Sequence, residues 1–274
     1  MENEGLVRVA VFLGVFAAMA LWEVLRPRRD LVASKGRRWG VNWGIVLIDT
    51  VVVRLLFPAA AAGAALDAAA NGWGLFNWLG WPSWLEVLLA VVAFDCLIYW
   101  QHVLSHRIPV LWRLHRVHHS DRDIDVSTAI RFHPAEIALS MLLKIGAVYV
   151  LGPSALAVIL FEVILNGCAL FNHSNVRLPG WADRLLRFVV VTPDMHRVHH
   201  SVIHREKDAN FGFNLPWWDR LFGTYVAQPE KGHEGMTIGL DEFQDDRPTR
   251  LGWSLMLPLR DRHGNRYGNR YGNS

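Results

Sequence analysis

Residues 83–107 read SWLEVLLAVVAFDCLIYWQHVLSHR, a largely apolar stretch that ends with His102 and His106. A helix needs about 20 mostly apolar residues to cross the roughly 30 Å hydrocarbon core of a bilayer. Because backbone polar groups in lipid must be paired within the segment, we expect a membrane-spanning helix from 83 to about 101. The sequence then changes abruptly to His, Arg and Asp, which places the first histidine pair at the membrane boundary.

The composition of the whole chain indicates a membrane protein. Of the 274 residues, 52% are hydrophobic and 19% are charged, whereas soluble proteins carry about a quarter charged residues. Disordered, coiled-coil and collagen-like classes are thereby excluded. Cys96 and Cys168 are the only cysteines, so a disulfide scaffold and a thiolate zinc site are excluded too. The net charge is +3, and the basic residues lie in loops. This distribution suits contact with an anionic membrane surface, and we expect no nucleic-acid partner.

Four further segments are long and apolar enough to span a bilayer. They are expected at residues 6–25, 41–66, 135–150 and 154–172. Gly152 and Pro153 separate the last two, which should form a hairpin. Arg8 and the lack of a small-residue cleavage site favour a retained first helix over a signal peptide. Arg54, in the second segment, has no role that the sequence assigns.

Loop charge predicts the orientation. The loop between the first two spans is basic and includes Arg28, Arg29, Lys35, Arg37 and Arg38. The loop at 67–82 has no Lys or Arg and offers Trp73, Trp78 and Trp81 as interfacial anchors. By the positive-inside rule the first loop is cytoplasmic. Alternation along the chain then places all the His-rich segments on the cytoplasmic side.

Histidine spacing predicts a metal site. Ten of the 13 histidines fall between positions 102 and 200, and residues 115–120 and 196–201 both read HRVHHS. On a helix, i, i+3 and i+4 positions share one face with Cβ atoms about 5–6 Å apart, so two imidazoles can bind one ion. So many ligands exceed the capacity of one ion and predict two metals. The candidate ligands are His102, His106, His115, His118, His119, His133, His173, His196, His199 and His200.

Two of these candidates stand apart from the spaced clusters. His133 precedes Pro134, which suits the first turn of a helix, and His173 follows the fifth span. Taken alone, each fits a solvated or capping residue. Their expected position at the membrane boundary favours both as ligands, His173 more than His133.

Two predicted spans carry a stripe of polar residues. Asp95 and Tyr99 share the helix face of the histidine pair on the third span, and Glu162 and Asn166 share the face of His173 on the fifth. Such groups are costly in a bilayer and indicate function, here as neighbours that orient the ligands. The alternative is hydrogen bonding that holds the bundle together. At 1.5 Å per residue the carboxylates lie roughly 16 Å deeper than the last ligand on each helix, so Tyr99 and Asn166 are expected nearer the metals.

The identity of the metal is open at this point. Imidazole suits Zn, Cu, Fe and Ni alike. The chain has no HExxH, which a hydrolytic zinc site would favour. Haem takes at most two axial ligands and does not explain adjacent His-His pairs.

The ordered motifs resemble the fatty acid hydroxylase / sterol desaturase superfamily over roughly 87–226. They are His102-x3-His106, the two HRVHHS copies, Asn210-Phe211-Gly212 and WWDRLFGT at 217–224. The resemblance implies an integral-membrane, non-haem enzyme with two Fe ions that uses O2 and external electrons to hydroxylate or desaturate a lipid. The lipid would be a sterol, a fatty-acyl chain or a related isoprenoid or alkyl chain.

The resemblance carries further expectations. It implies a site under a cytoplasmic cap, a substrate tail that enters from the bilayer, and an electron donor of the cytochrome b5 or ferredoxin type. His133-Pro134-x-Glu136 resembles a stretch of sterol-oxidising members, which favours His133 as a tenth ligand or near neighbour. The lone His173 departs from some fatty-acyl members, which have a further spaced pair there.

The expected fold is all-α, a multi-span membrane bundle with a cytoplasmic helical cap that holds a His-rich di-metal site. Residues 1–82 form N-terminal membrane helices and loops, 83–226 the catalytic domain, and 227–274 a C-terminal extension. The tandem RYGN repeat at 266–273 predicts a disordered tail. Two other functions stay open: a His-lined membrane metal transporter or sensor, and an enzyme-derived scaffold without activity.

Overall fold

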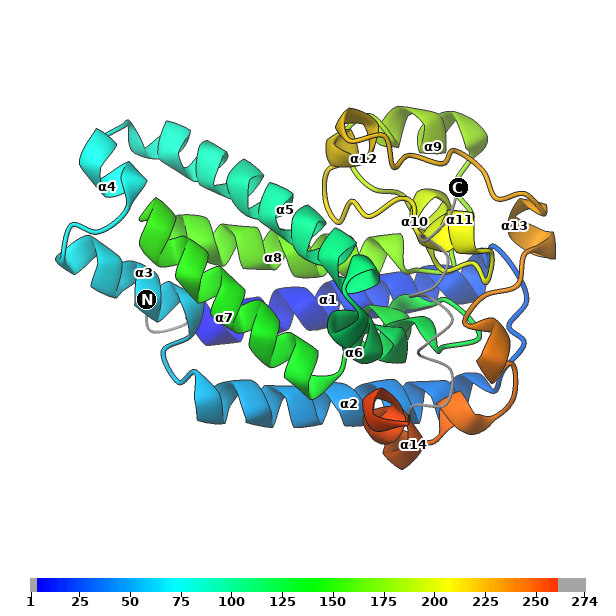
Figure 1. Ribbon diagram of the computed structural model, residues 1–274. Coiled ribbons are helices and arrows are strands. Elements are labelled where there is room, and N and C mark those ends of the chain that lie inside the picture. The colour runs from blue at the N-terminus through cyan, green and yellow to red at the C-terminus, as the bar shows by residue number, and fades with distance from the viewer. Residues whose placement is uncertain (1–3, 261–274) are drawn as a thin grey trace, which may run out of the picture.

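Five helices of 18 or more residues form a bundle in the computed structural model, and most of the short helices gather as a cap at one end of it (Figure 1). The structure describes residues 4–260, and within them no strand forms. The longer helices are α1 (Glu4–Leu25), α2 (Lys35–Leu56), α3 (Ala60–Ala70), α5 (Ser83–Arg107), α6 (Pro109–His119), α7 (Pro134–Leu151) and α8 (Ala155–Asn172). The short helices are α4 (Leu75–Leu79), α9 (Gly180–Leu186), α10 (Pro193–His199), α11 (His204–Lys207), α12 (Trp217–Leu221), α13 (Gly232–Gly235) and α14 (Leu251–Met256). The 3-10 turns are η1 (Val126–Ile130), η2 (Asp241–Phe243), η3 (Arg247–Thr249) and η4 (Leu257–Leu259).

Five segments of the described chain are helical, long and apolar enough to cross a membrane. They are Gly5–Leu25, Lys35–Leu79, Ser83–Arg107, Pro134–Leu151 and Ala155–Asn172. The predicted all-α class and multi-span bundle with a helical cap are confirmed. The third span runs further than expected, because α5 continues to Arg107 and carries the histidine pair as its last turns.

The second expected span, over 41–66, lies within the candidate span Lys35–Leu79, but it is not one continuous helix. Helix α2 ends at Leu56, and α3 begins only at Ala60. Pro58 lies between them, and proline has no backbone N–H to continue a helical ladder. Arg54 lies in the last turn of α2, where a positive charge complements the helix dipole, and its side chain is exposed.

The hairpin of α7 and α8 turns where the sequence predicts. Gly152 ends α7 with φ +66°, a left-handed conformation that favours glycine. A Cβ at this position would lie 2.5 Å from the carbonyl oxygen of Trp73, so the turn packs directly on the connection between α3 and α4. The hydroxyl of Ser154 then caps α8 by accepting the N–H of Ala157.

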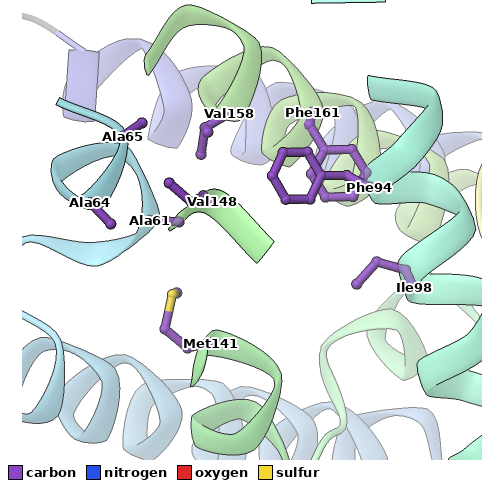
Figure 2. Packing of buried hydrophobic residues seen from close by; sticks show 9 residues of the cluster. All are labelled: Ala61, Ala64, Ala65, Phe94, Ile98, Met141, Val148, Val158 and Phe161. Atoms are coloured by element: carbon purple, nitrogen blue, oxygen red, sulfur yellow. The ribbon is translucent and has the colours of Figure 1, made fainter. Parts of the chain in front are cut away.

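The apolar interior of the bundle lies between α3, α5, α7 and α8 (Figure 2). The rings of Phe94 and Phe161 stack with centroids 5.1 Å apart, which joins α5 to α8. Helix α3 contributes only alanines to this cluster, Ala61, Ala64 and Ala65. Small side chains let helix backbones approach closely, as is typical of membrane bundles.

The loop between α1 and α2 and the first turn of α2 pack at the cap end of the bundle through ion pairs. Arg28 bonds with Asp194, next to α10's first histidine, at 3.1 Å. Arg38 is fully buried and bonds with Asp121 and Asp125, each at 2.6 Å. The basic loop and the histidine-bearing cap therefore lie at the same end of the bundle.

The C-terminal extension is part of the same body as far as residue 260. Trp253 and Leu257 pack against α2 in a buried cluster, and the carbonyl of Leu257 accepts a hydrogen bond from Arg116 on α6. The RYGN repeat with its predicted disorder lies outside the described residues. The proposed boundaries at 82 and 226 stay a prediction.

Candidate metal centre

Nine of the ten candidate ligands converge at the junction of bundle and cap, in two groups. Within each group, one ligand atom per residue lies within 4.8 Å of all the others. The first group is His102, His106, His115, His119 and His199, and the second group is His118, His173, His196 and His200. The groups adjoin, since the rings of His119 and His200 stack with centroids 4.7 Å apart.

Each HRVHHS copy serves both groups. On α6, His115 and His119 are four residues apart and belong to the first group. His118, between them, belongs to the second group. On α10 the assignment is reversed, because His196 and His200 belong to the second group and His199 to the first. Helical spacing thus divides each triplet, and the two helices together complete both groups.

Hydrogen bonds orient most of the rings. In six of them Nδ1 lies 2.6 to 3.2 Å from an oxygen that can only accept. Each of these Nδ1 atoms therefore carries the proton and donates, which leaves a lone pair on Nε2. The pairs are His102 with the Phe211 carbonyl, His106 with the Asp208 carboxylate, His115 with the Glu136 carboxylate, His118 with the Arg131 carbonyl, His173 with the Ala169 carbonyl, and His199 with the Ala209 carbonyl.

The inward nitrogens fit a bound cation. Nε2 of His118 and Nε2 of His173 lie 3.1 Å apart. Each of these atoms carries a lone pair, because the Nδ1 of each ring holds the proton and donates it. Two lone pairs at this distance repel unless a cation lies beside them. In the first group the Nε2 atoms of His102, His115 and His199 are buried without a hydrogen-bond partner. Buried polar atoms are normally paired, so this donor set is suited to metal.

Burial keeps the cap imidazoles neutral. Five of these histidines have a pKa well below the ordinary value of 6.5. Burial is the main cause, and the neighbouring imidazoles lower the pKa further. The five are His118, His119, His196, His199 and His200. Burial likewise lowers the pKa of His173 to about 4. Neutral imidazole is the form that binds metal, so the site is ready for ligation at pH 7.

His133 is not part of either group. Its Nε2 lies 3.1 Å from the carbonyl of Leu255, and its Nδ1 accepts the N–H of Ala135 as the N-cap of α7. Both ring nitrogens are therefore engaged, and the structure does not bring this tenth candidate to the metal groups. The capping role that the sequence also suggested is the one observed.

The polar stripe on α5 binds the cap. Asp95 accepts hydrogen bonds from the indole N–H of Trp218, at 2.8 Å, and from two backbone N–H groups at 214–215. The hydroxyl of Tyr99 lies 2.9 Å from that of Thr224. Within the described part of the chain, no hydrogen bond joins either side chain to a histidine. The expectation that Tyr99 directly contacts a ligand is therefore not met.

The segment that Asp95 contacts, residues 209–218, also orients two ligands, and we call it the cap segment. Its carbonyls at 209 and 211 accept the Nδ1 protons of His199 and His102. Between them, Asn210 adopts φ +51°, and its side chain bonds with the backbone of Met195 and Val226. This left-handed turn points the two carbonyls at two members of the first group.

Asp219 holds the segment from the other side. It accepts the backbone N–H groups of Phe211 and Gly212 at 2.7 and 2.8 Å and the hydroxyl of Thr224 at 2.7 Å. A Cβ on Gly212 would lie 2.7 Å from the carboxylate of Asp219. This position therefore has no room for a side chain. Burial raises the pKa of Asp219 to about 6, below neutral pH, so the clamp is ionised at pH 7.

The polar stripe on α8 has different partners. Glu162 forms ion pairs with Arg8 of α1 and, at 2.8 Å, with Lys144 of α7. The side chain of Asn166 is exposed and donates to the carbonyl of Glu162. Helical geometry places Asn166 on the stripe, but its side chain is exposed and bonds with its own helix, so the expected contact with a ligand is not formed.

Sequence reasoning missed two carboxylates that touch the site. Glu136, at 2.6 Å from His115, was noted only for its resemblance to a family stretch, and Asp208, at 3.2 Å from His106, was not singled out. Carboxylate acceptors of this kind fix a ring and raise its basicity as a ligand. Glu136 follows His133 by three residues in the first turn of α7, and that position was its only signal. Nothing in the sequence points to Asp208, because its partner His106 lies 102 positions away.

A sequence model of the fatty acid hydroxylase family matches residues 87–224, the stretch that carries all nine histidines of the two groups. The chain belongs to this family. Family membership implies non-haem iron, and the two groups described above are able to hold metal. The match includes the whole WWDRLFGT stretch, whose Asp219 bonds with the cap segment.

Curated relatives include lipid-modifying enzymes. The chain is 32% identical to ornithine lipid hydroxylase OlsE of Rhizobium tropici, over 80% of this chain and 67% of the relative. It is 28% identical to alkylglycerol monooxygenase of Xenopus tropicalis, over 77% of this chain and 47% of the relative. It is 26% identical to cholesterol 25-hydroxylase of Rattus norvegicus, over 53% of this chain and 48% of the relative. The chain thus spans about half the length of the last two, and no solved structure matched significantly.

Proposed function

We propose that this protein is a membrane-bound non-haem di-iron oxygenase that uses O2 and external electrons to hydroxylate or desaturate a lipid. The observation that carries the proposal is the pair of adjacent groups of neutral imidazoles with lone pairs turned inward. Imidazole also suits zinc, copper and nickel. Family membership favours iron.

The protein's part in the reaction is to bind, orient and exclude water. Iron, when bound, supplies the O2 chemistry that no side chain provides. Glu136 and Asp208 hold the Nδ1 protons of His115 and His106 and so raise the basicity of those rings. Because nearly all the rings are buried, bulk water is kept from the reacting centre.

Phe213 stands where the lipid chain would reach the metals. Its ring centroid lies 6.1 Å from that of His102, 6.5 Å from that of His173 and 6.4 Å from that of His196. The same ring packs against the apolar cluster that contains Phe94. An alkyl chain that enters from the bundle would therefore pass Phe213, and we assign this residue to the substrate path.

The substrate class rests on the relatives. An ornithine lipid hydroxylase, an alkylglycerol monooxygenase and a cholesterol 25-hydroxylase act by name on different lipids. These names favour hydroxylation of a lipid here, with desaturation as the alternative outcome. A separate donor of the cytochrome b5 or ferredoxin type would supply the electrons.

The cap is proposed to face the cytoplasm. Arg28 and Arg29 of the α1–α2 loop and Lys35, Arg37 and Arg38 at the start of α2 are at the cap end and have protein partners. For example, Arg29 bonds with the carbonyl of Met236, and Arg37 pairs with Asp246 at 3.6 Å. Orientation is set during insertion, before these contacts form, so the positive-inside argument still applies. Reporter fusions at position 75 and after residue 274 test it, and a cytoplasmic signal at 75 would contradict it.

A metal transporter or sensor is the second candidate. A transport site must release its ion, whereas here six rings are held by hydrogen bonds and eight are buried. Metal flux into liposomes, without any O2-dependent change in lipid, would favour the transporter over the enzyme.

The test combines metal content with lipid analysis. Protein purified into nanodiscs should hold about two irons per chain, and lipid extracts of a host that expresses it should contain an oxidised lipid absent without it. His118→Ala and His199→Ala, one from each group, should lower iron content and abolish turnover while the protein still inserts. Full activity in either variant would overturn the assignment.

A further inference from the structure

The cap carries an apolar surface outside the bundle. It lies on α9, on the residues that follow α9, and on α12, and we call it the α9–α12 patch. Its exposed members are Trp181, Leu185, Phe188, Val189, Trp217 and Leu221. Trp181 is 66% exposed, Phe188 63% and Leu221 69%. Large apolar patches on a protein surface mark an interaction site.

The two helices present this patch as one surface. The indole N–H of Trp217 donates to the carbonyl of Phe188 at 2.6 Å. The guanidinium of Arg220 donates to the carbonyl of Arg187 at 3.1 Å and lies 5.6 Å from the centroid of the Phe188 ring. Figure 1 shows α9 and α12 side by side at the edge of the cap.

The patch continues onto a membrane-spanning helix. Phe222, directly after α12, has its ring centroid 4.8 Å from that of Trp100 on α5. Trp100 is 42% exposed and belongs to one of the five segments long and apolar enough to cross a membrane. The apolar surface of α5 therefore adjoins the cap through this ring contact.

Charged residues border the patch in the way that suits a lipid surface. Arg184 on α9 and Arg220 on α12 are exposed beside the apolar side chains. Aromatic and aliphatic residues with flanking Arg are typical of helices that lie in the interface plane of a membrane. Tryptophan in particular is enriched at the headgroup level.

We propose that the α9–α12 patch is inserted into the headgroup and acyl-chain boundary of the bilayer that the long helices span. The cap then rests on one leaflet beside α5 and is not held wholly above the membrane. Continuity with the α5 surface selects this occupant over a soluble partner or a second copy of the chain.

The test uses an environment-sensitive label in full-length protein. In a Cys96→Ala/Cys168→Ala background, single variants Leu185→Cys and Leu221→Cys are labelled with a nitrobenzoxadiazole probe and placed in nanodiscs that contain shallow nitroxide lipids. Arg205→Cys and Glu230→Cys are matched controls, since these exposed residues form an ion pair elsewhere on the cap. Trp181→Cys is a second reporter should either patch variant fail to fold.

Insertion predicts a blue-shifted emission and nitroxide quenching at the patch positions, at least about twofold stronger than at the controls. Emission typical of water with equal, weak quenching at all positions would overturn the proposal. A blue shift without quenching would also overturn the proposal, because it would mean that protein and not lipid covers the patch. The mass of the particle would then show whether that protein is a second copy of this chain or another protein.

Discussion

The polar stripes of α5 and α8 look alike in sequence and differ in the structure. On each helix a carboxylate, a second polar residue and a histidine recur at nearly the same spacing. Asp95 on α5 bonds with the cap segment that also orients a ligand, whereas Glu162 on α8 bonds with Arg8 and Lys144 inside the bundle. One stripe therefore joins cap to membrane helix, and the other joins membrane helices to each other.

Helical periodicity identifies a polar face of a helix but not the element that packs against it. The α5 stripe ends in His102 and His106 of the first group, and the α8 stripe ends in His173 of the second group. What separates them is the element that packs alongside, the cap on α5 and helices α1 and α7 on α8. Variants of corresponding residues should accordingly fail in different ways.

The largest effect is expected at the two histidines, where the stripes are equivalent. His102→Ala and His173→Ala each remove a ligand from one group. Turnover should fall by more than the roughly 10- to 100-fold that outer-shell losses cost, and iron content should fall with it, as measured by metal analysis and activity. His133→Ala is the matched control and should keep its iron, because both its ring nitrogens are engaged elsewhere. Iron loss in the control would restore His133 as a ligand.

Glu162→Gln should mainly destabilise the bundle. The variant leaves Arg8 and Lys144 without their buried carboxylate, and breaking a buried ion pair from one side costs about 3–5 kcal/mol. Thermal unfolding in detergent should show the loss, while iron content of the folded fraction stays unchanged. Lys144→Met added to Glu162→Gln should recover part of the stability. A variant of wild-type stability that lacks iron would contradict the assignment of this stripe to the bundle.

Asp95→Asn should act on the cap and the site. The carboxylate accepts three N–H groups of the cap segment, and such a charged acceptor contributes about 1.5–3 kcal/mol per bond. Iron affinity should fall by about 10- to 100-fold, as measured by chelator competition. Asp95→Ala should weaken iron binding further, because Asn keeps one acceptor oxygen. Loss of stability with unchanged iron affinity in both variants would make the two stripes equivalent.

The smallest effect is expected at Asn166. Its exposed side chain bonds only with its own helix among the hydrogen bonds of the described chain, so Asn166→Ala should change stability by no more than about 0.5 kcal/mol. Turnover and iron content should match the unmodified protein in a parallel assay. A drop of 10-fold or more would show that Asn166 reaches a ligand, as periodicity alone suggests.

Much of the site could be predicted because its signals are local. The i, i+3, i+4 spacing of HRVHHS needs only helical geometry to gather imidazoles, and the apolar runs need only the thickness of a bilayer. The break at Pro58 follows from the chemistry of proline, although the apolar run continues through it. Glu136 and Asp208 could not be placed, because their contacts depend on how α7 and the cap dock against α5 and α6.

Apolar runs and histidine spacing suffice to predict the helical class, the five candidate membrane spans apart from the break at Pro58, and which histidines share a helix face. Only the tertiary structure decided that each HRVHHS triplet divides between two groups, that His133 caps α7, and that Asp95 and Glu162 serve different interfaces. The reason is physical. Periodicity and hydropathy follow from the chain's own backbone geometry and solvent, whereas the partner of a polar side chain depends on which distant segment packs against it.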